Sequence, residues 1–551
     1  MYRLTKFSIC LLATLIFGPN HTIKAQEALY VNTTLRVFEN LPLYVGGDLN
    51  LDNNSDLHAQ PGANLLIKGD VTNSASAGLT LEANSTKYAQ LQFEGSYSGS
   101  GTVEHQMYFA GGWHMVGASM NATTAGYFGN VGSNAVGGTI NTQNLFFWDG
   151  SQYVNVANNS ASITPGVGYF GYVGDYGFHD DGDNTNNTGA GTYSFTGSPN
   201  SSIALGNLFN STAATNITIQ NGQANQGWNL VANPFTCTID FDLLGRTGLD
   251  NSFYIYDPNK TGGAGYESMS AAGIGETTIA PKQSFWVRAN GSGLPSLGTL
   301  SMKNHCNLAG SPKFFKQTKN FDRLVLRTHP LGSDSIEDYT VVSFVEHTSK
   351  SFDSKWDAYK LLNSGDIPNI YSDERDALSI NAIDFGPNYP EADSIAISYR
   401  AAHHGQAYEI SFDKSFMIYS YAVFLEDKKL ASFTDLNKEP YQFLYDSTHI
   451  SRFVLHFSSQ SVGLAELLQR NQASLEMWYH QGKIHFIANY KGRTELSLMD
   501  LSGRILWHSP VSFDKNKITR IQMNHSIPEG IYLLHSQEKS TSYRQTVLIK
   551  L

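Results

Sequence analysis

Cysteine is scarce in this sequence, and its placement limits the sulfur chemistry that the protein can have. Cysteine occurs 3 times in 551 residues, at Cys10, Cys237 and Cys306. Cys10 lies in an N-terminal segment that we expect to be removed, and the spacing of the other two fits no zinc-binding pattern. In an oxidising compartment Cys237 and Cys306 can form a disulfide, and two separate thiols are the alternative. The sequence leaves both open.

Positive charge is also in short supply. The chain has 37 Lys and Arg against 48 Asp and Glu, a formal net charge of −11. Removal of residues 1–25, with Arg3, Lys6 and Lys24, takes this charge to −14. Nucleic acid rewards clustered positive charge, so we expect no nucleic-acid partner. An acidic surface instead keeps an exported protein soluble.

Catalytic signatures and long apolar runs are missing as well. The sequence has no Gly-x-Ser-x-Gly elbow, no Cys/His signature, no His-Glu-x-x-His helix and no phosphate-binding Gly loop. No run after the N-terminal segment approaches the ~20 apolar residues that a transmembrane helix needs. We therefore predict a protein that is not an enzyme and has no transmembrane span.

Glycine and aromatic residues are frequent instead. The chain has 50 glycines and 12% aromatic residues, and only 15% of its residues are charged. This composition favours strands and tight turns over helices. We predict an all-β, multi-domain protein, and the length allows about three to five domains.

Residues 1–25 have the pattern of a secretory signal peptide. Arg3 and Lys6 precede an apolar stretch at 7–17, and Ala25 ends a cleavage site before Gln26. No cysteine follows this site, which argues against a lipoprotein anchor. The pattern predicts export.

Residues 26–109 contain a short recurrence. The sequence VGGDLNL at 45–51 is echoed by LIKGDVTN at 66–73, so that Gly69 comes 22 residues after Gly47, and LQFEG at 91–95 is a weaker third echo. Short strands at this interval, each ending in Gly and Asn, predict a short β-solenoid or a β-meander.

Residues 110–310 contain a longer duplication. GWHMVGAS at 112–119 returns as GWNLVANP at 227–234, NLFFWD at 144–149 matches SFYIYD at 252–257, and ITPGVGYF at 163–170 matches IAPKQSFW at 279–286. Three blocks in the same order predict a duplicated β-sandwich-like unit. We interpret its aromatic residues as core, with a sugar-stacking platform as the alternative.

Residues 311–457 are richer in charge and contain alternating strand-like runs, which predict an Ig-like β-sandwich. Residues 458–474 form the expected linker. Residues 475–551 again alternate in short runs and predict a terminal β-sandwich. Within it, Gly503 follows Asp500 where a hairpin turn requires a positive φ, and Gly530 precedes a strand that contains Tyr532.

The C-terminal residues LMDLSGR at 498–504, IPEGIYLL at 527–534 and VLIK at 547–550 resemble the type A-like C-terminal sorting domain of Bacteroidota proteins that use the type IX secretion system. On this resemblance the sorting motif comprises Asp500, Gly503, Arg504, Gly530, Tyr532 and Lys550. The resemblance implies folding in the periplasm and passage across the outer membrane by the type IX machinery, usually with removal of the sorting domain and attachment to the cell surface or release. An ordinary terminal immunoglobulin-like domain is the alternative.

Two polar segments are candidates for metal binding. The loop HDDGDNTNN at 179–187 offers Asp180, Asp181, Asp183 and Asn184 as closely spaced oxygen ligands for Ca²⁺, and a solvated, turn-rich insertion is the other interpretation. His403 and His404 are adjacent and would point to opposite faces of a strand, so we interpret them as part of a turn before Gly405 rather than a metal site.

The sequence thus predicts a secreted or cell-surface β protein with a non-enzymatic role in adhesion or surface structure. Its expected partners are the type IX machinery and an unidentified surface or glycan ligand, and its only candidate cofactor is Ca²⁺. A carbohydrate-binding protein or a surface glycoside hydrolase is the alternative, because the paired carboxylates of a glycosidase cannot be picked from one sequence.

Overall fold

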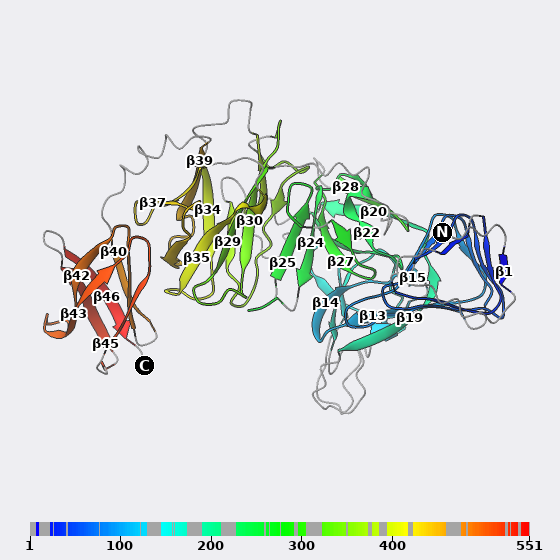
Figure 1. Ribbon diagram of the computed structural model, residues 1–551, viewed down its shortest axis with the longest axis horizontal. Coiled ribbons are helices and arrows are strands. Elements are labelled where there is room, and N and C mark those ends of the chain that lie inside the picture. Colours follow the sequence, from blue (N-terminus) through cyan, green and yellow to red (C-terminus); the bar gives the residue numbers. More distant parts are fainter. Residues whose placement is uncertain are drawn as a thin grey trace.

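The computed structural model describes residues 7–549 apart from 10–22, 26, 40–41, 76–77, 122, 129–144, 157, 159, 174–189, 211–226, 258–259, 264, 276, 291–295, 305–321, 349–350, 373–376, 385–393, 417–421, 459–474, 481–482, 524–526, 529 and 538–541. The described residues form an all-β protein of several sheets, which follow one another along its longest axis (Figure 1).

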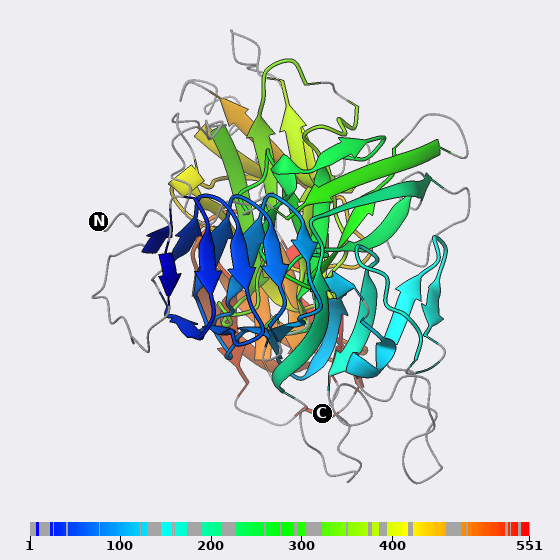
Figure 2. The ribbon, with the colours of Figure 1, turned by 90° about the vertical axis from the view of Figure 1, so that its right-hand side faces the viewer.

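The N-terminal part is a short parallel β-solenoid with three faces, whose rungs are stacked side by side in Figure 2. The first face consists of β1 (Phe7–Ile9), β3 (Leu29–Val31), β6 (Leu49–Leu51), β9 (Val71–Asn73) and β12 (Tyr97–Ser98). The second consists of β4 (Thr34–Val37), β7 (Asp56–Ala59), β10 (Leu79–Leu81) and β13 (Val103–Phe109), and the third of β2 (Ile23–Ala25), β5 (Leu43–Val45), β8 (Asn64–Ile67) and β11 (Gln90–Phe93). The strand pairs are parallel, so the solenoid prediction is confirmed and the meander is excluded.

The echoed glycines explain the repeat. Gly69 donates its N–H to the carbonyl of Gly47 at 2.8 Å, and Gly95 donates to Gly69 at 3.1 Å. A Cβ on Gly69 would lie 2.8 Å from the Gly47 oxygen, closer than side chains tolerate, so this ladder requires glycine. The following aspartate fixes the next rung, because Asp48 Oδ1 accepts a hydrogen bond from the N–H of Asp70 at 2.8 Å.

The C-terminal end of the solenoid is covered. Strand β19 (Gly191–Pro199) pairs antiparallel with β13, and it also pairs with β15 (Met120–Asn121). The edge of β11 is covered by Thr236, whose hydroxyl donates to the carbonyl of Leu91 at 2.9 Å. A covered edge does not pair with other chains. At the N-terminal end β1 and β2, which belong to the expected signal segment, pair with β3 and β5 and are themselves the outermost strands of their sheets.

The duplicated unit is confirmed by two sheets of the same strand order. The first copy has the order β14-β18-β16-β17 and the second β21-β27-β24-β25, so each strand has its counterpart in the other copy. The strands of the first copy are β14 (Gly112–Val116), β16 (Leu145–Trp148), β17 (Tyr153–Asn155) and β18 (Tyr169–Val173). Those of the second are β21 (Trp228–Ala232), β24 (Ser252–Asp257), β25 (Gly265–Ser270) and β27 (Ser284–Arg288).

Small elements surround the two copies. They are η1 (Ala125–Phe128), η3 (Phe241–Leu243), the sheet of β20 (Ser202–Asn210), β28 (Ser296–Lys303) and β23 (Gly245–Thr247), and the pair β22 (Ile239–Asp240) and β26 (Thr278–Ile279).

The two copies contact each other reciprocally. Gly117 of the first copy donates its N–H to the carbonyl of Lys282 at 2.8 Å, and Ala232, the counterpart of Gly117, donates to Gly166 at 2.9 Å. Gly166 and Lys282 follow the prolines of the matched turns, and both have positive φ, +86° and +60°. Equivalent groups therefore meet as in a two-fold symmetric dimer, within one chain.

Lys282 differs from its counterpart Gly166 because it has a side chain, and this side chain is buried in the interior. Its Nζ lies 2.7 Å from Nδ1 of His105 on β13 and 4.6 Å from the centre of the Phe195 ring. Burial lowers the pKa values of both Lys282 and His105 well below their usual range, and the neighbouring Lys282 adds to the effect on His105. This contact ties the second copy to the end of the solenoid.

Residues 322–458 form one continuous curled sheet, nearly a closed barrel, which we call the barrel-like sheet. Its order is β37-β36-β39-β34-β32-β33-β30-β29-β35-β38, with β31 beside β33. The expected sandwich layers are therefore joined edge to edge around one core that includes Leu326, Tyr399 and Phe443. Its elements are β29 (Asp322–Pro330), β30 (Asp338–Phe344), β31 (Ala358–Tyr359), β32 (Asn369–Ser372), β33 (Leu378–Ile383), β34 (Ser394–Arg400), β35 (Ala407–Asp413), η4 (Lys414–Phe416), β36 (Ala422–Asp427), β37 (Ser432–Asp435), β38 (Tyr441–Leu444) and β39 (Phe453–Ser458).

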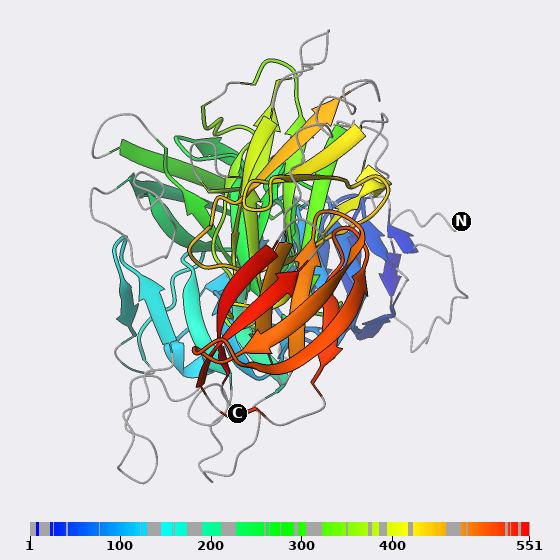
Figure 3. The same cartoon turned by 90° about the vertical axis from the view of Figure 1, so that its left-hand side faces the viewer.

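The C-terminal domain is a sandwich of two antiparallel sheets with its own core, which includes Phe486, Leu498 and Phe513 (Figure 3). One sheet contains β40 (Leu475–His480), β41 (Lys483–Ala488) and β44 (Thr519–Gln522). The other contains β43 (Ile505–Phe513), β42 (Gly492–Met499), β45 (Gly530–Gln537) and β46 (Ser542–Ile549).

The outer face of the second copy is buried against the barrel-like sheet. Tyr254 accepts a hydrogen bond from the N–H of Tyr359 at 2.8 Å, and Ser270 donates to the carbonyl of Trp356 at 3.0 Å. Trp228 and Trp286 on this face are fully buried. The counterpart of Trp228 in the first copy, Trp113, remains partly exposed.

We predict that the two copies differ in their sensitivity to truncation. Trp228→Ala should cost about 3–5 kcal/mol, because it opens a cavity in an interface that joins three parts of the chain. Trp113→Ala should cost clearly less, since its ring already contacts solvent. Denaturant unfolding of the two variants followed by fluorescence checks this, and equal losses would contradict it.

Candidate ligand-binding pocket

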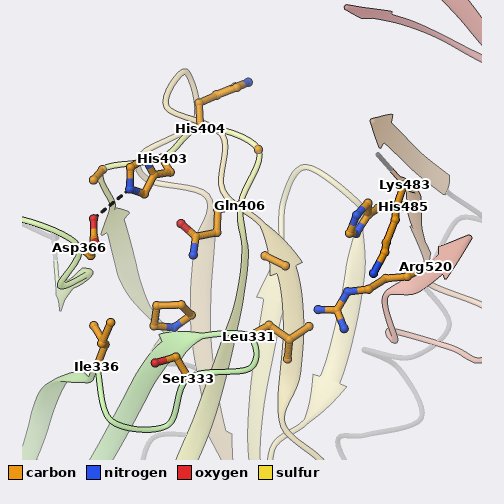
Figure 4. Close-up of a pocket in the computed structure, with 14 residues that line it drawn as sticks. Leu331, Ser333, Ile336, Asp366, His403, His404, Gln406, Lys483, His485 and Arg520 are labelled. Carbon is orange, nitrogen blue, oxygen red and sulfur yellow. Dashed lines mark hydrogen bonds and ion pairs between the residues drawn. The ribbon is translucent and has the colours of Figure 1, made fainter. Parts of the chain in front are cut away.

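A cavity of about 790 Å³ lies where the barrel-like sheet meets the C-terminal domain (Figure 4). The barrel-like sheet contributes the turn between β29 and β30, Asp366, and the turn between β34 and β35. The C-terminal domain contributes Lys483 and His485 from β41 and Arg520 from β44. The pocket is therefore a product of domain packing.

The turn between β34 and β35 carries His403 and His404. Gly405 follows them with a φ of +81°, as the turn interpretation requires. His403 Nε2 lies 2.9 Å from Asp366 Oδ1, whereas His404 Nδ1 lies 3.3 Å from the backbone nitrogen of Ser447. The two imidazoles thus have different partners, and the prediction of a turn is confirmed.

The facing wall carries positive charge. His485 and Arg520 are directly opposite each other in the antiparallel pair β41–β44, and Lys483 is two residues before His485 on the same face. Figure 4 shows the three side chains close together at the rim of the cavity. Within the described part of the chain, neither Lys483 nor Arg520 forms an ion pair.

Polar contacts hold the two walls together. Asn489 Nδ2 donates to the carbonyl of Leu430 at 3.1 Å, and Asn516 Nδ2 donates to Thr434 Oγ1 at 2.6 Å. The N–H of Ile518 donates to Gln442 Oε1 at 3.3 Å. These bonds join the C-terminal domain to strands β37 and β38 and to the turn after β36.

An ionic network adds to this interface. Lys429 Nζ lies 2.8 Å from Asp446 Oδ2 and also pairs with Glu476 at the start of the C-terminal domain. Arg452 lies 3.7 Å from Glu476 and forms a buried pair with Asp427. Burial by itself would raise the pKa of Asp446, but hydrogen bonds from Lys429 and Thr448 outweigh it and hold this pKa well below its usual range.

The predicted sorting motif forms an ordered turn. Asp500 Oδ1 accepts hydrogen bonds from the N–H groups of Ser502 and Arg504, both at 3.0 Å, and Arg504 Nε returns to Asp500 Oδ2 at 3.1 Å. Gly503 has a φ of +87°, as predicted. The structure thus brings Asp500, Gly503 and Arg504 together.

The remaining motif residues lie elsewhere in the domain. Gly530 begins β45, and the hydroxyl of Tyr532 donates to the carbonyl of Pro528 at 2.9 Å. Lys550 lies outside the described residues.

Two other predictions fall on residues that the structure does not describe. The Ca²⁺ candidates Asp180, Asp181, Asp183 and Asn184 lie in the gap 174–189, and Cys306 lies in the gap 305–321. Cys237 is buried, with its Sγ 2.9 Å from the carbonyl oxygen of Asn304, two residues before Cys306. The disulfide and the Ca²⁺ site therefore stay predictions.

The described residues contain no group of three or more His, Cys, Asp or Glu side chains placed to hold a metal ion. Likewise, no helix among them is both long and apolar enough to cross a membrane.

Sequence reasoning missed the pocket. The charged residues of its two walls lie more than 100 positions apart in the chain, as Asp366 and Arg520 illustrate, and they meet only because the two domains pack. The three basic side chains on β41 and β44 follow no local motif, so no sequence signal could have found them.

These observations define a multi-sheet all-β protein that combines a short solenoid, a duplicated unit, a barrel-like sheet and a terminal sandwich. The chain belongs to the family described as "Domain of unknown function (DUF8693)", which matches residues 31–457. A comparison with curated proteins found no match. The family match ends within β39, so the C-terminal domain lies outside it.

We predict that acidification weakens the packing of the barrel-like sheet through Asp446. Because its folded pKa is depressed, this carboxylate stabilises the fold above its unfolded pKa of about 4, and the contribution is lost as pH falls below that value. Asp446→Asn should lower the melting temperature at pH 7. At pH 3 the difference in melting temperature between this variant and the wild type should be smaller. Glu346→Gln, at an exposed side chain just after β30, is the control and should change neither value.

Proposed function

We propose that this protein is exported by the type IX secretion machinery and acts at the cell surface or in the medium as a non-enzymatic adhesion or structural protein. The observation that carries the proposal is the C-terminal sandwich. It has its own core, contains the ordered turn from Asp500 to Arg504, and lies outside the region that the family match covers. A domain built in this way suits a delivery signal attached to a separate working part.

The remaining architecture supports a binding or structural role. The solenoid, the two copies and the barrel-like sheet follow one another and give an extended body (Figure 1). Extended stacks of strands present long surfaces to partners. The N-terminal signal pattern supplies the first export step.

The export proposal is tested by comparing the full chain with a version that ends at Ala473, both expressed in a host with a working type IX system. We expect only the full chain to reach the surface or the medium, as measured by cell fractionation. A second variant, Asp500→Ala in the full chain, should also reduce export because it removes the hydrogen bonds that order the turn. Equal delivery of the full and the shortened chains would contradict the proposal.

A carbohydrate-binding role is the second candidate, and the outer face of the first copy favours it. Trp113 stacks on Phe170 with ring centres 4.9 Å apart, next to Phe146 and Tyr172. All four rings are partly exposed, and the neighbouring Tyr153 is 36% exposed. In the second copy the barrel-like sheet covers the equivalent face. Aromatic rings that remain open can stack on the apolar faces of sugars.

On this second candidate function, we predict that Trp113→Ala lowers the affinity for neutral polysaccharides tenfold or more. Tyr30→Ala, at a tyrosine of the solenoid that is 55% exposed, is the matched control and should bind like the wild type. Affinity electrophoresis gives the binding, and an assay for released reducing ends separates a binding protein from a hydrolase. Unchanged binding by the Trp113 variant would remove this face as the site.

A further inference from the structure

The pocket between the barrel-like sheet and the C-terminal domain is lined by two cations, Lys483 and Arg520, for which the described residues provide no ion pair. Both lie on the same face of the neighbouring strands β41 and β44. Like charges on neighbouring strands repel and destabilise a sheet. The chain has 48 acidic residues and a net charge of −11, yet Asp366 is the carboxylate that lines this cavity.

Asp366 does not balance the basic wall. It belongs to the opposite side of the cavity, where its Oδ1 lies 2.9 Å from His403 Nε2 (Figure 4). The described residues provide no ion pair for Lys483 or Arg520, although both line the cavity. A guanidinium and an ammonium side by side are well suited to a carboxylate or a sulfate group.

The opposite wall offers neutral hydrogen-bonding groups. Gln406 Oε1 accepts from the hydroxyl of Tyr408 at 3.1 Å, which leaves the amide nitrogen of Gln406 as a donor. The hydroxyl of Ser333 also lines the cavity. Its volume of about 790 Å³ falls in the range of small-molecule sites.

We propose that this pocket binds an anionic saccharide, with its carboxylate or sulfate group against Lys483 and Arg520 and its hydroxyl groups against Gln406 and Ser333. A saccharide is favoured over an acidic peptide because the wall opposite the cations provides groups that match sugar hydroxyls. The inference applies to the full chain with its C-terminal domain in place, because Lys483 and Arg520 belong to that domain. It goes beyond the glycan platform on the first copy, because the site, the ligand charge and the residues are different.

Both walls are needed for this site, so the ligand bridges two domains. A ligand that binds only the docked arrangement stabilises it by mass action. Binding of an anionic sugar should therefore raise the temperature at which the C-terminal domain separates or unfolds.

The test uses the purified full chain and isothermal titration calorimetry with four probes of similar size. Tetragalacturonate carries carboxylates, a sulfated tetrasaccharide carries sulfates, maltotetraose is neutral, and tetraglutamate is an acidic peptide. We expect at least one of the two charged saccharides to bind, and its affinity should fall as the salt concentration is raised. The charged saccharide that binds more tightly shows whether the site prefers a carboxylate or a sulfate. Equal affinity for maltotetraose or for tetraglutamate would overturn the proposal, as would no binding of either charged sugar.

Variants locate the site. Lys483→Gln and Arg520→Gln should each weaken binding of the charged sugar about tenfold, and the double variant about a hundredfold, because each removes one charge-assisted hydrogen bond. Lys491→Gln is the matched control, since this lysine lies on the same domain, is 79% exposed and pairs with Asp514 outside the pocket. Melting curves without ligand confirm that the variants fold. Full affinity in the folded double variant would assign the ligand to another site.

Discussion

The burial of one aromatic face holds the middle of this protein together. Trp228, Tyr254 and Trp286 form the outer face of the second copy, and both the first copy and the barrel-like sheet pack on it. Trp148 of the first copy contacts Trp286 edge to face at 5.2 Å, and its Nε1 donates to the carbonyl of Trp228 at 2.9 Å. Large apolar areas removed from water supply most of the stability of such a junction, and the few hydrogen bonds fix its geometry.

The same junction makes two similar sheets unequal. Reciprocal hydrogen bonds between Gly117 and Lys282 and between Ala232 and Gly166 relate the copies as in a symmetric dimer. Only the second copy then meets the barrel-like sheet, so its face becomes core while that of the first copy stays partly open. Duplication followed by one-sided burial thus leaves an aromatic surface available for another role, which is the basis of the glycan alternative.

The C-terminal domain has two relations to the rest of the chain. Its separate core and its position outside the family match favour a delivery role, whereas the bonds of Asn489, Asn516 and Glu476 attach it to the barrel-like sheet. The basic pocket exists only while this attachment lasts. Removal of the domain after export, as the resemblance to sorting domains implies, would therefore also remove the anion site, and the two proposals meet at this point.

The sequence by itself determined the local patterns. The 22-residue interval between Gly47 and Gly69 is one turn of the solenoid, and the matched blocks around Trp113 and Trp228 became two sheets of one strand order. The predictions of the solenoid and of the duplicated unit were confirmed because glycine ladders and strand alternation depend on neighbours in the chain or in the repeat. Tertiary structure alone decided which copy is buried, why Lys282 stands where the other copy has Gly166, and how Asp366 comes to face Arg520. Such contacts depend on how whole domains pack, and no local spacing encodes that.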